Sequence, residues 1–244
     1  MIKLGVDNGN YNTKSSEGML YASGYTASDK EFITPDMQLF YEGRYYAVGE
    51  RRMRFQQDKT REPDTFMLTL PAIADAMKRA ETTSAEIALG VGLPIGSYGT
   101  QKEAFRRYFL RDNVSFLFEE TSYRCRIAEC KVFAQGHAAL CRYYPQLKDY
   151  RSITLVDIGG YTVDVLTLHD FRLDRSSCAS LRMGTITLYS RIQDTLQRND
   201  ILLSDELITD AIRGDIQHAD GKLIQAVVEQ AVAAYCKELL NALR

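Results

Sequence analysis

Two aspartates in this sequence each stand at the end of a predicted strand and are followed by glycine. Asp7 comes after the strand-like residues 3–6, and Asp157 comes after the apolar residues 152–156. Glycine lets a backbone approach a ligand closely, and the N–H groups of such a turn can form a cradle for an anion. A carboxylate at the same place can hold a hydrated Mg²⁺ against that anion. The two segments therefore predict phosphate and metal binding.

In both segments the chain returns as a second strand after the turn. Lys14 lies on the first returning strand, where its ammonium could reach a β- or γ-phosphate, and Asp164 lies on the second. Each segment alone also fits an ordinary hairpin turn, but a pair, one in each half of the chain, favours a nucleotide held from both sides. The turn residues expected to contact the phosphates are Gly9, Asn10, Tyr11, Asn12, Gly159, Gly160, Tyr161 and Thr162.

Composition limits the class of protein. The chain has 244 residues, of which 45% are hydrophobic and 25% charged, as in ordinary globular proteins. The net charge of −2 gives no basic field for direct nucleic-acid binding, and no apolar run has the length of a membrane span. The five cysteines lack paired zinc spacing, which predicts reduced thiols and a cytoplasmic location.

Periodicity predicts alternating strands and helices. The Glu42-Gly43 pair predicts a hairpin turn, Pro71 a restart within a helix, and residues 22–36 an irregular segment. The elements predicted in the first half are strands at 38–41, 44–48, 86–91, 114–118 and 123–129, and helices at 64–80, 98–111 and 131–144. The second half is predicted to contain strand material at 171–181 and helices at 186–197, 204–213 and 221–243.

Local signals refine the helical predictions. Thr185 and Ser204 are expected to cap their helices, because their hydroxyls can accept hydrogen bonds from the first turn. Arg106, Arg107 and Arg111 are expected on the polar side of the helix at 98–111. The apolar side of the last helix is expected to carry Leu223, Val227, Ala231, Ala234 and Leu239.

Positive charges are concentrated between residues 51 and 61. The preferred interpretation is a solvated loop or helix face; the alternative is a contact surface for another subunit or an acidic partner. The residues concerned are Arg51, Arg52, Arg54, Lys59 and Arg61.

The paired turns resemble the phosphate-1 and phosphate-2 motifs of the actin, Hsp70 and sugar kinase superfamily. The first turn matches the form Asp-x-Gly-x-x-x-x-Lys from Asp7 to Lys14. The order of the segments is most similar to the ParM/StbA branch of bacterial actin-like ATPases, which segregate plasmids, and the resemblance covers essentially the whole chain. The features that carry it are Asp157-Ile158-Gly159-Gly160, the strand end Gly92-Leu93-Pro94, and Gly184 with its helix.

The resemblance implies an α/β, actin-like (ribonuclease H-like) ATPase fold with two similar halves around a nucleotide cleft. Domain I would span 1–148, with a small inserted subdomain near 22–63. Domain II would span 149–244, with a helical subdomain near 198–222. The family continues after the long helix with a glycine-rich adenosine motif, so we expect the C-terminal part to be missing from this chain or the protein to lack the usual adenine clamp.

For the site, the resemblance implies ATP and Mg²⁺. Asp7 and Asp157 would hold the metal, mostly through water. Gln135, in the predicted connecting helix, and Asp164 would orient the attacking water, although Asp164 could instead cap or solvate its hairpin. Gly184 would add a contact at the start of its helix, where N–H groups favour anions.

The implied function is an ATP-dependent filament that segregates plasmid DNA. Its partners would be further copies of itself and a small DNA-binding adaptor, with no direct contact to nucleic acid or membrane. Hydrolysis would be slow in the monomer and stimulated by assembly. Two alternatives remain: a sugar-kinase-like phosphotransferase, and a nucleotide-responsive binding module with little hydrolysis.

Overall fold

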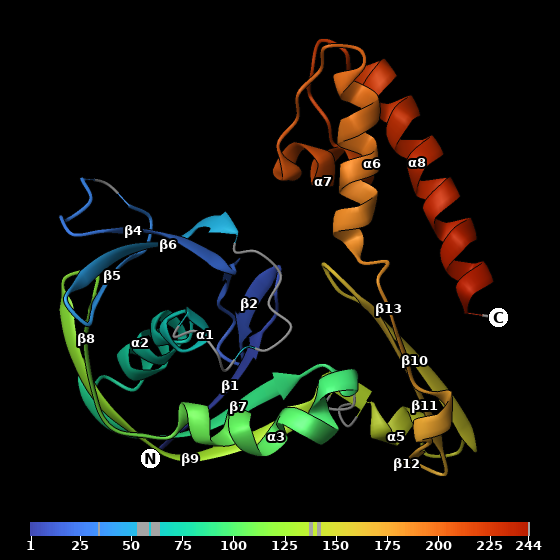
Figure 1. Cartoon of the computed structure of the whole chain (residues 1–244). Helices are drawn as coiled ribbons and strands as arrows, with labels where there is room; N and C mark the ends of the chain where they lie inside the picture. Colours follow the sequence, from blue (N-terminus) through green and yellow to red (C-terminus); the bar gives the residue numbers. More distant parts are fainter. Residues whose placement is uncertain (34, 53–58, 60–63, 137–138, 141–142, 244) are drawn as a thin grey trace. The chain divides into compact units, whose positions relative to one another are not determined.

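The chain forms two compact units. The computed structural model describes residues 1–33, 35–52, 59, 64–136, 139–140 and 143–243. The first unit contains Met1–Asp157 and Asp164–Ser180, and the second contains Ile158–Val163 and Leu181–Arg244. Figure 1 shows the elements of both units. The predicted domain division after residue 148 stays a prediction.

A nine-stranded mixed sheet dominates the first unit. Two neighbouring pairs, β1 with β7 and β7 with β9, are parallel, so these three strands end at the same edge. In spatial order the strands are β3 (Leu20–Ala22), β2 (Asn12–Ser15), β1 (Ile2–Asn8), β7 (Ser84–Leu93), β9 (Thr121–Ala134), β8 (Arg111–Phe118), β5 (Gln38–Tyr41), β6 (Arg44–Arg52) and β4 (Gly24–Ser28).

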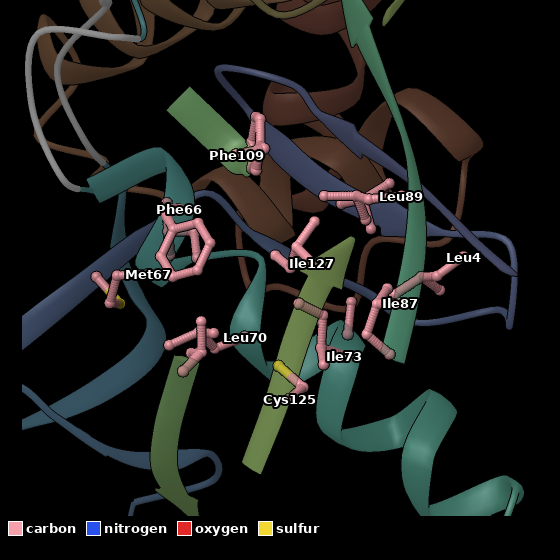
Figure 2. Packing of buried hydrophobic residues seen from close by; sticks show 14 of the residues in the cluster. Leu4, Phe66, Met67, Leu70, Ile73, Ile87, Leu89, Phe109, Cys125 and Ile127 are labelled. Carbon is pink, nitrogen blue, oxygen red and sulfur yellow. The ribbon is translucent and has the colours of Figure 1, made fainter. Parts of the chain in front are cut away.

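The core of the first unit lies between this sheet and its helices. The sheet curves around α1 (Asp64–Met67) and α2 (Leu70–Arg79), while α3 (Ile95–Phe109) packs on β7 and β9 (Figure 1). Alternate residues of β7 are buried, and each buried aliphatic side chain contributes about 1.5–3 kcal/mol. Figure 2 shows the centre of this core: Leu4, Phe66, Met67, Leu70, Ile73, Ile87, Leu89, Phe109, Cys125 and Ile127.

A smaller sheet follows in sequence. Its strands are β10 (Ser152–Ile158), β11 (Val163–His169), β12 (Arg172–Leu173) and β13 (Ala179–Leu181), preceded by the short helix α5 (Tyr144–Leu147). The order is β10-β11-β12, and β13 pairs with β11. In the 3₁₀ turn η1 (Arg175–Ser177), the Asp174 carboxylate accepts a hydrogen bond from the backbone N–H of Ser176, which caps the turn.

The second unit is a helical bundle of α6 (Thr185–Gln197), α7 (Asp205–Arg213) and α8 (Gly221–Ala242). Each helix packs on the other two, and a bidentate pair at 3.0 and 2.8 Å joins Arg191 to Glu238. The predicted Ser204 cap is confirmed, because its hydroxyl accepts from the Leu207 N–H. The predicted Thr185 cap is wrong: Gly184 stands at that position, without a side-chain cap.

Within the described ranges, no helix combines the length and the hydropathy that a membrane crossing requires.

The predicted helix at 131–144 is wrong over its first part. Residues up to Ala134 continue β9, Gln135 and Gly136 form a turn, and the described helical residues are Ala139 and Leu140. The reason is pairing: Val132 and Ala134 are buried alternately as β9 lies against β7, and this outweighs the helical preference of the segment.

Other predictions need smaller corrections. Residues 22–36 are not wholly irregular, because β4 pairs with β6 there. Arg111 begins β8 rather than lying on the helix, which ends at Phe109. The buried side of α8 is shifted from the predicted one, since Leu223 is exposed and the buried side chains are Ile224, Val228, Tyr235 and Leu239. The hairpin at Glu42-Gly43 and the restart at Pro71 are confirmed.

Gly136 sets the direction of the chain after β9, and we expect Gly136→Ala to destabilise the protein by about 2–4 kcal/mol. Its φ is +77°, and an added Cβ would lie 2.7 Å from Leu155 Cδ2. Gly18→Ala is the matched control. Its φ is +95°, but no atom lies within 4 Å of an added Cβ, so we expect a loss of stability of about 1 kcal/mol. Urea unfolding of both variants checks this, and equal losses would contradict the steric argument.

Candidate functional site

The first hairpin places opposite charges face to face. Asp7 on β1 is the register partner of Lys14 on β2. The pair follows from the sequence spacing, because the turn between the strands leaves these residues opposite one another. An anion at the turn would therefore meet a cation and a metal-binding carboxylate at the same point.

The turn of this hairpin requires glycine and is fixed by a serine. A Cβ on Gly9 would lie 2.5 Å from the Asn12 carbonyl oxygen, so a larger residue would distort the turn. The Ser23 hydroxyl donates to the Gly9 carbonyl at 2.6 Å, and the Ser23 N–H donates to the Tyr11 carbonyl at 3.0 Å. Sequence reasoning missed Ser23, because nothing in its local pattern shows that β3 returns beside the turn.

Gln135 reaches Asp7 across the intervening strand. Its Nε2 donates to Asp7 Oδ1 at 2.5 Å, and its backbone N–H donates to the Leu93 carbonyl at 2.8 Å. Gly92 on β7 makes the crossing possible, because a Cβ there would lie only 2.9 Å from Gln135 Cγ. Gln135 was predicted on a connecting helix, and it lies instead in the turn after β9.

Asn8 extends the site into the core. It is buried, and its Nδ2 donates to Thr69 Oγ1 at 2.9 Å. Its Oδ1 has no hydrogen-bond partner among the described residues. A buried, unsatisfied amide oxygen is costly, so the site has capacity for a further donor such as water.

Lys59 and Arg52 contradict the prediction of a solvated basic stretch. Lys59 is only 5% exposed, and its ammonium donates to the Asn8 carbonyl. The Arg52 guanidinium lies 3.9 Å from the centre of the Tyr11 ring. Burial lowers the pKa of Lys59 to about 8, and the charge of Asp7 acts in the opposite direction. Arg54 and Arg61 lie outside the described residues.

The carboxyl groups of Asp157 and Asp164 both have raised pKa values. Burial raises the pKa of Asp157, the charge of Asp7 raises it further, and the Lys14 ammonium lowers it. Burial also raises the pKa of Asp164, which the Ser180 hydroxyl lowers and the charge of Asp157 raises. Asp7, Lys14 and Asp157 therefore act on one another electrostatically.

The second turn is bonded to the start of α6. The Gly159 N–H donates to the Thr162 carbonyl at 2.9 Å, which closes the turn. The Gly159 and Gly160 carbonyls then accept from the N–H groups of Thr185 and Ile186, at 3.0 and 2.9 Å. These first donors of α6 are therefore already engaged by protein.

Gly184 fits this junction because it has no side chain. A Cβ on it would lie 2.3 Å from the Gly160 carbonyl oxygen, and its N–H donates to the Tyr161 carbonyl at 3.1 Å. The predicted contact of Gly184 with a nucleotide stays a prediction, and the geometry shows a packing reason for glycine at this position.

The donor set fits a hydrated metal and phosphate better than a directly ligated metal. No group of three or more His, Cys, Asp or Glu side chains in the described part of the chain is arranged to hold a metal ion. Asp7 and Asp157 supply carboxylates, Lys14 supplies positive charge, and the glycine turn gives close backbone approach. This combination suits Mg²⁺, which keeps several waters when it binds with phosphate.

The first unit also contains a cavity of about 530 Å³, and its lining includes Ser180, whose hydroxyl acts on Asp164. Residues of α3, the end of β9 and the β12–β13 segment line it, including Tyr98, Phe133 and Cys178. None of the carboxylates described above is among its lining residues.

Comparison with known proteins supports the fold. The sequence family described as "Actin like proteins N terminal domain" matches residues 5–137, more than half of the chain. The family "Archaeal actin homologue MreB-like, C-terminal" matches residues 155–244. A search of curated protein sequences finds no match.

Solved structures with the same fold include three informative examples. The archaeal actin homolog Ta0583 in complex with ADP is 18% identical, with a TM-score of 0.79 over 100% of this chain and 81% of its own. A ParM filament from Clostridium botulinum is 15% identical, with a TM-score of 0.76 over 99% and 83%. The AlfA filament from the B. subtilis plasmid pLS32 is 19% identical, with a TM-score of 0.62 over 94% and 88%.

We expect Asp164→Asn to increase the free energy of unfolding at pH 7. The raised pKa means that the folded state disfavours the ionised carboxylate, so wild type loses stability as the pH rises from the unfolded value of 3.8 through the folded one. The Asp164 Oδ1 also lacks a partner among the described residues. Urea unfolding between pH 4 and pH 7 should show that the advantage of the variant grows with pH.

Asp174→Asn is the control with the opposite sign. The Ser176 and Ser177 hydroxyls lower the pKa of Asp174 to about 2. The ionised carboxylate therefore stabilises the folded state at pH values above 3.8, the pKa in the unfolded chain. This variant should lose stability at neutral pH. A pH-independent difference for Asp164→Asn would contradict the burial argument.

Proposed function

The chain belongs to the actin-like proteins, and on that premise we propose that it binds ATP with Mg²⁺ at the first hairpin and hydrolyses the γ-phosphate slowly. The observation that carries the proposal is the hydrogen bond of 2.5 Å from Gln135 to Asp7, opposite Lys14. It joins a water-orienting amide, a metal-holding acid and a phosphate-binding cation at one edge of a sheet.

The roles follow from what phosphoryl transfer requires. Transfer to water depends on charge neutralisation and on positioning of the nucleophile more than on covalent catalysis. Lys14 and the N–H groups of the turn at residues 9–12 neutralise phosphate charge. Asp7 and Asp157 would hold Mg²⁺, mostly through water, and the metal would supply further positive charge to the phosphate oxygens.

Gln135 is oriented by the acid that it contacts. A carboxylate accepts hydrogen bonds, so the amide nitrogen must face Asp7, and the amide oxygen is left to accept from a water molecule. Asp164, buried and with its pKa raised, is the second group proposed to orient that water. The Gly159–Thr162 turn is proposed as the second phosphate contact.

We further propose that the protein assembles into filaments that segregate plasmid DNA through a small DNA-binding adaptor. Family membership supports self-association, and two of the similar structures are filaments of ParM and AlfA. Arg106 and Arg107 on α3 are exposed or partly exposed candidates for a polar contact between copies. A head-to-tail contact that does not close on itself produces a filament rather than a ring.

We expect Gln135→Ala to lower the kcat of ATP hydrolysis by at least about tenfold while the Kd for ATP changes by less than about twofold, because water orientation acts in the transition state. Single-turnover hydrolysis and equilibrium titration separate the two quantities. An equal loss of binding and turnover would identify Gln135 as a structural residue of the turn after β9.

Gly92→Ala should reproduce part of this defect without removing the amide. The added methyl group would displace Gln135, whereas Gly90→Ala, on the same strand, would meet Phe133 at an ordinary 3.4 Å. Gly90→Ala is therefore the matched control and should retain wild-type turnover.

We expect assembly to require ATP and to show a threshold concentration. Pelleting and light scattering of the chain with ATP, with ADP and without nucleotide measure it, and added salt should raise the threshold because polar contacts are screened.

Asp157→Ala should not assemble with ATP if assembly needs metal-dependent binding of the nucleotide. A chain that binds ATP but stays monomeric at every concentration would favour the nucleotide-responsive binding module, and turnover dependent on a small acceptor would favour the kinase alternative.

A further inference from the structure

The basic stretch turns back onto the first hairpin at two described residues. Arg52, at the end of β6, lies over the Tyr11 ring, and Lys59 contacts the Asn8 carbonyl. Tyr11 belongs to the turn of this hairpin, and Asn8 is the last residue of β1. Two cations from a segment distant in sequence therefore reach the turn that we propose to bind phosphate.

In the part of the chain that the structure describes, no carboxylate forms a direct ion pair with Lys59. Its ammonium has three donors, and among the described residues the hydrogen-bond acceptor is the neutral Asn8 carbonyl. The charged group that acts on the pKa of Lys59 is Asp7, the residue before Asn8. Burying an ammonium is costly unless it is paired, so Lys59 has unused capacity for a negatively charged partner.

The charges around the first hairpin also favour a phosphate group as the partner of Lys59. Asp7, Asp157 and Asp164 contribute three carboxylates, and Lys14 alone among the predicted site residues opposes them. A polyphosphate entering such a site would meet net negative charge. The positive charge of the buried Lys59 ammonium, next to Asn8, reduces this repulsion.

We propose that Lys59 is a second phosphate-binding cation of this site, which acts with Lys14 on the polyphosphate of the nucleotide. The inference rests on the proposed function, because it assumes that the first hairpin binds nucleotide. It goes further by naming a group, outside both glycine turns, that selects for the number of phosphates. The Asn8 carbonyl orients the ammonium, and its remaining N–H groups donate to phosphate oxygens.

A purely structural role makes a different prediction. If Lys59 only anchors the end of β1, its loss should weaken the binding of every nucleotide to the same extent. If it binds phosphate, its loss should weaken ATP much more than AMP, because AMP lacks the β- and γ-phosphates.

The test is titration of the whole chain with ATP and with AMP, in the presence of Mg²⁺, for wild type and three variants. Lys59→Gln keeps an N–H donor for the Asn8 carbonyl and removes the charge. Lys59→Met removes both and serves as the second variant if the first does not fold, as judged by thermal unfolding. Lys78→Met, on the exposed end of α2, is the matched control for the loss of one lysine.

For Lys59→Gln we expect the Kd for ATP to rise at least about tenfold, the size of a charge-assisted hydrogen bond, while the Kd for AMP rises less than about twofold. Lys78→Met should match wild type for both ligands. Equal losses for ATP and AMP, or no loss, would overturn the role of Lys59 and leave the proposed function standing. A wild-type chain that binds neither nucleotide would overturn the proposed function itself, and the role of Lys59 with it.

Discussion

The carboxylate of Asp7 is the group on which the arrangement of the site depends. It ends β1, lies opposite Lys14 across the hairpin, and accepts the hydrogen bond of Gln135 from beyond the neighbouring strand. Its charge also influences Asp157 and Lys59, which come from other parts of the chain. One acid therefore connects the electrostatics of four segments that are far apart in sequence.

The absence of side chains is as important to this site as their presence. Gly92 leaves room for Gln135 to cross β7, Gly9 allows the first turn to close, and Gly184 allows α6 to start against the second turn. In each case a Cβ would lie within 3.0 Å of another heavy atom, which real side chains avoid. These glycines are explained by contact geometry rather than by flexibility.

The sequence was most informative where the chemistry is local. The two acid–glycine turns and the Ser204 cap depend on neighbouring residues, so spacing alone could predict them. The actin-like fold was predicted from the order of the same motifs, and the family matches confirm it.

Predictions failed where contacts between distant segments determine the local structure or the burial of a residue. The segment through Ala134 has residues that favour a helix, yet it pairs with β7 because its alternate side chains fill the core. Lys59 was expected in solvent because charge composition carries no information about burial. Ser23 was missed for a related reason, since its role depends on the return of β3 beside the first turn.

The second turn has a mechanical consequence. Its residues belong to the same compact unit as the helices, and hydrogen bonds from Thr185 and Ile186 bind its two glycine carbonyls directly to the first turn of α6. The tip of this hairpin is thus joined by hydrogen bonds to the helical bundle. Because these bonds tie the turn to the backbone of α6, a displacement of the turn would carry the first turn of the helix with it.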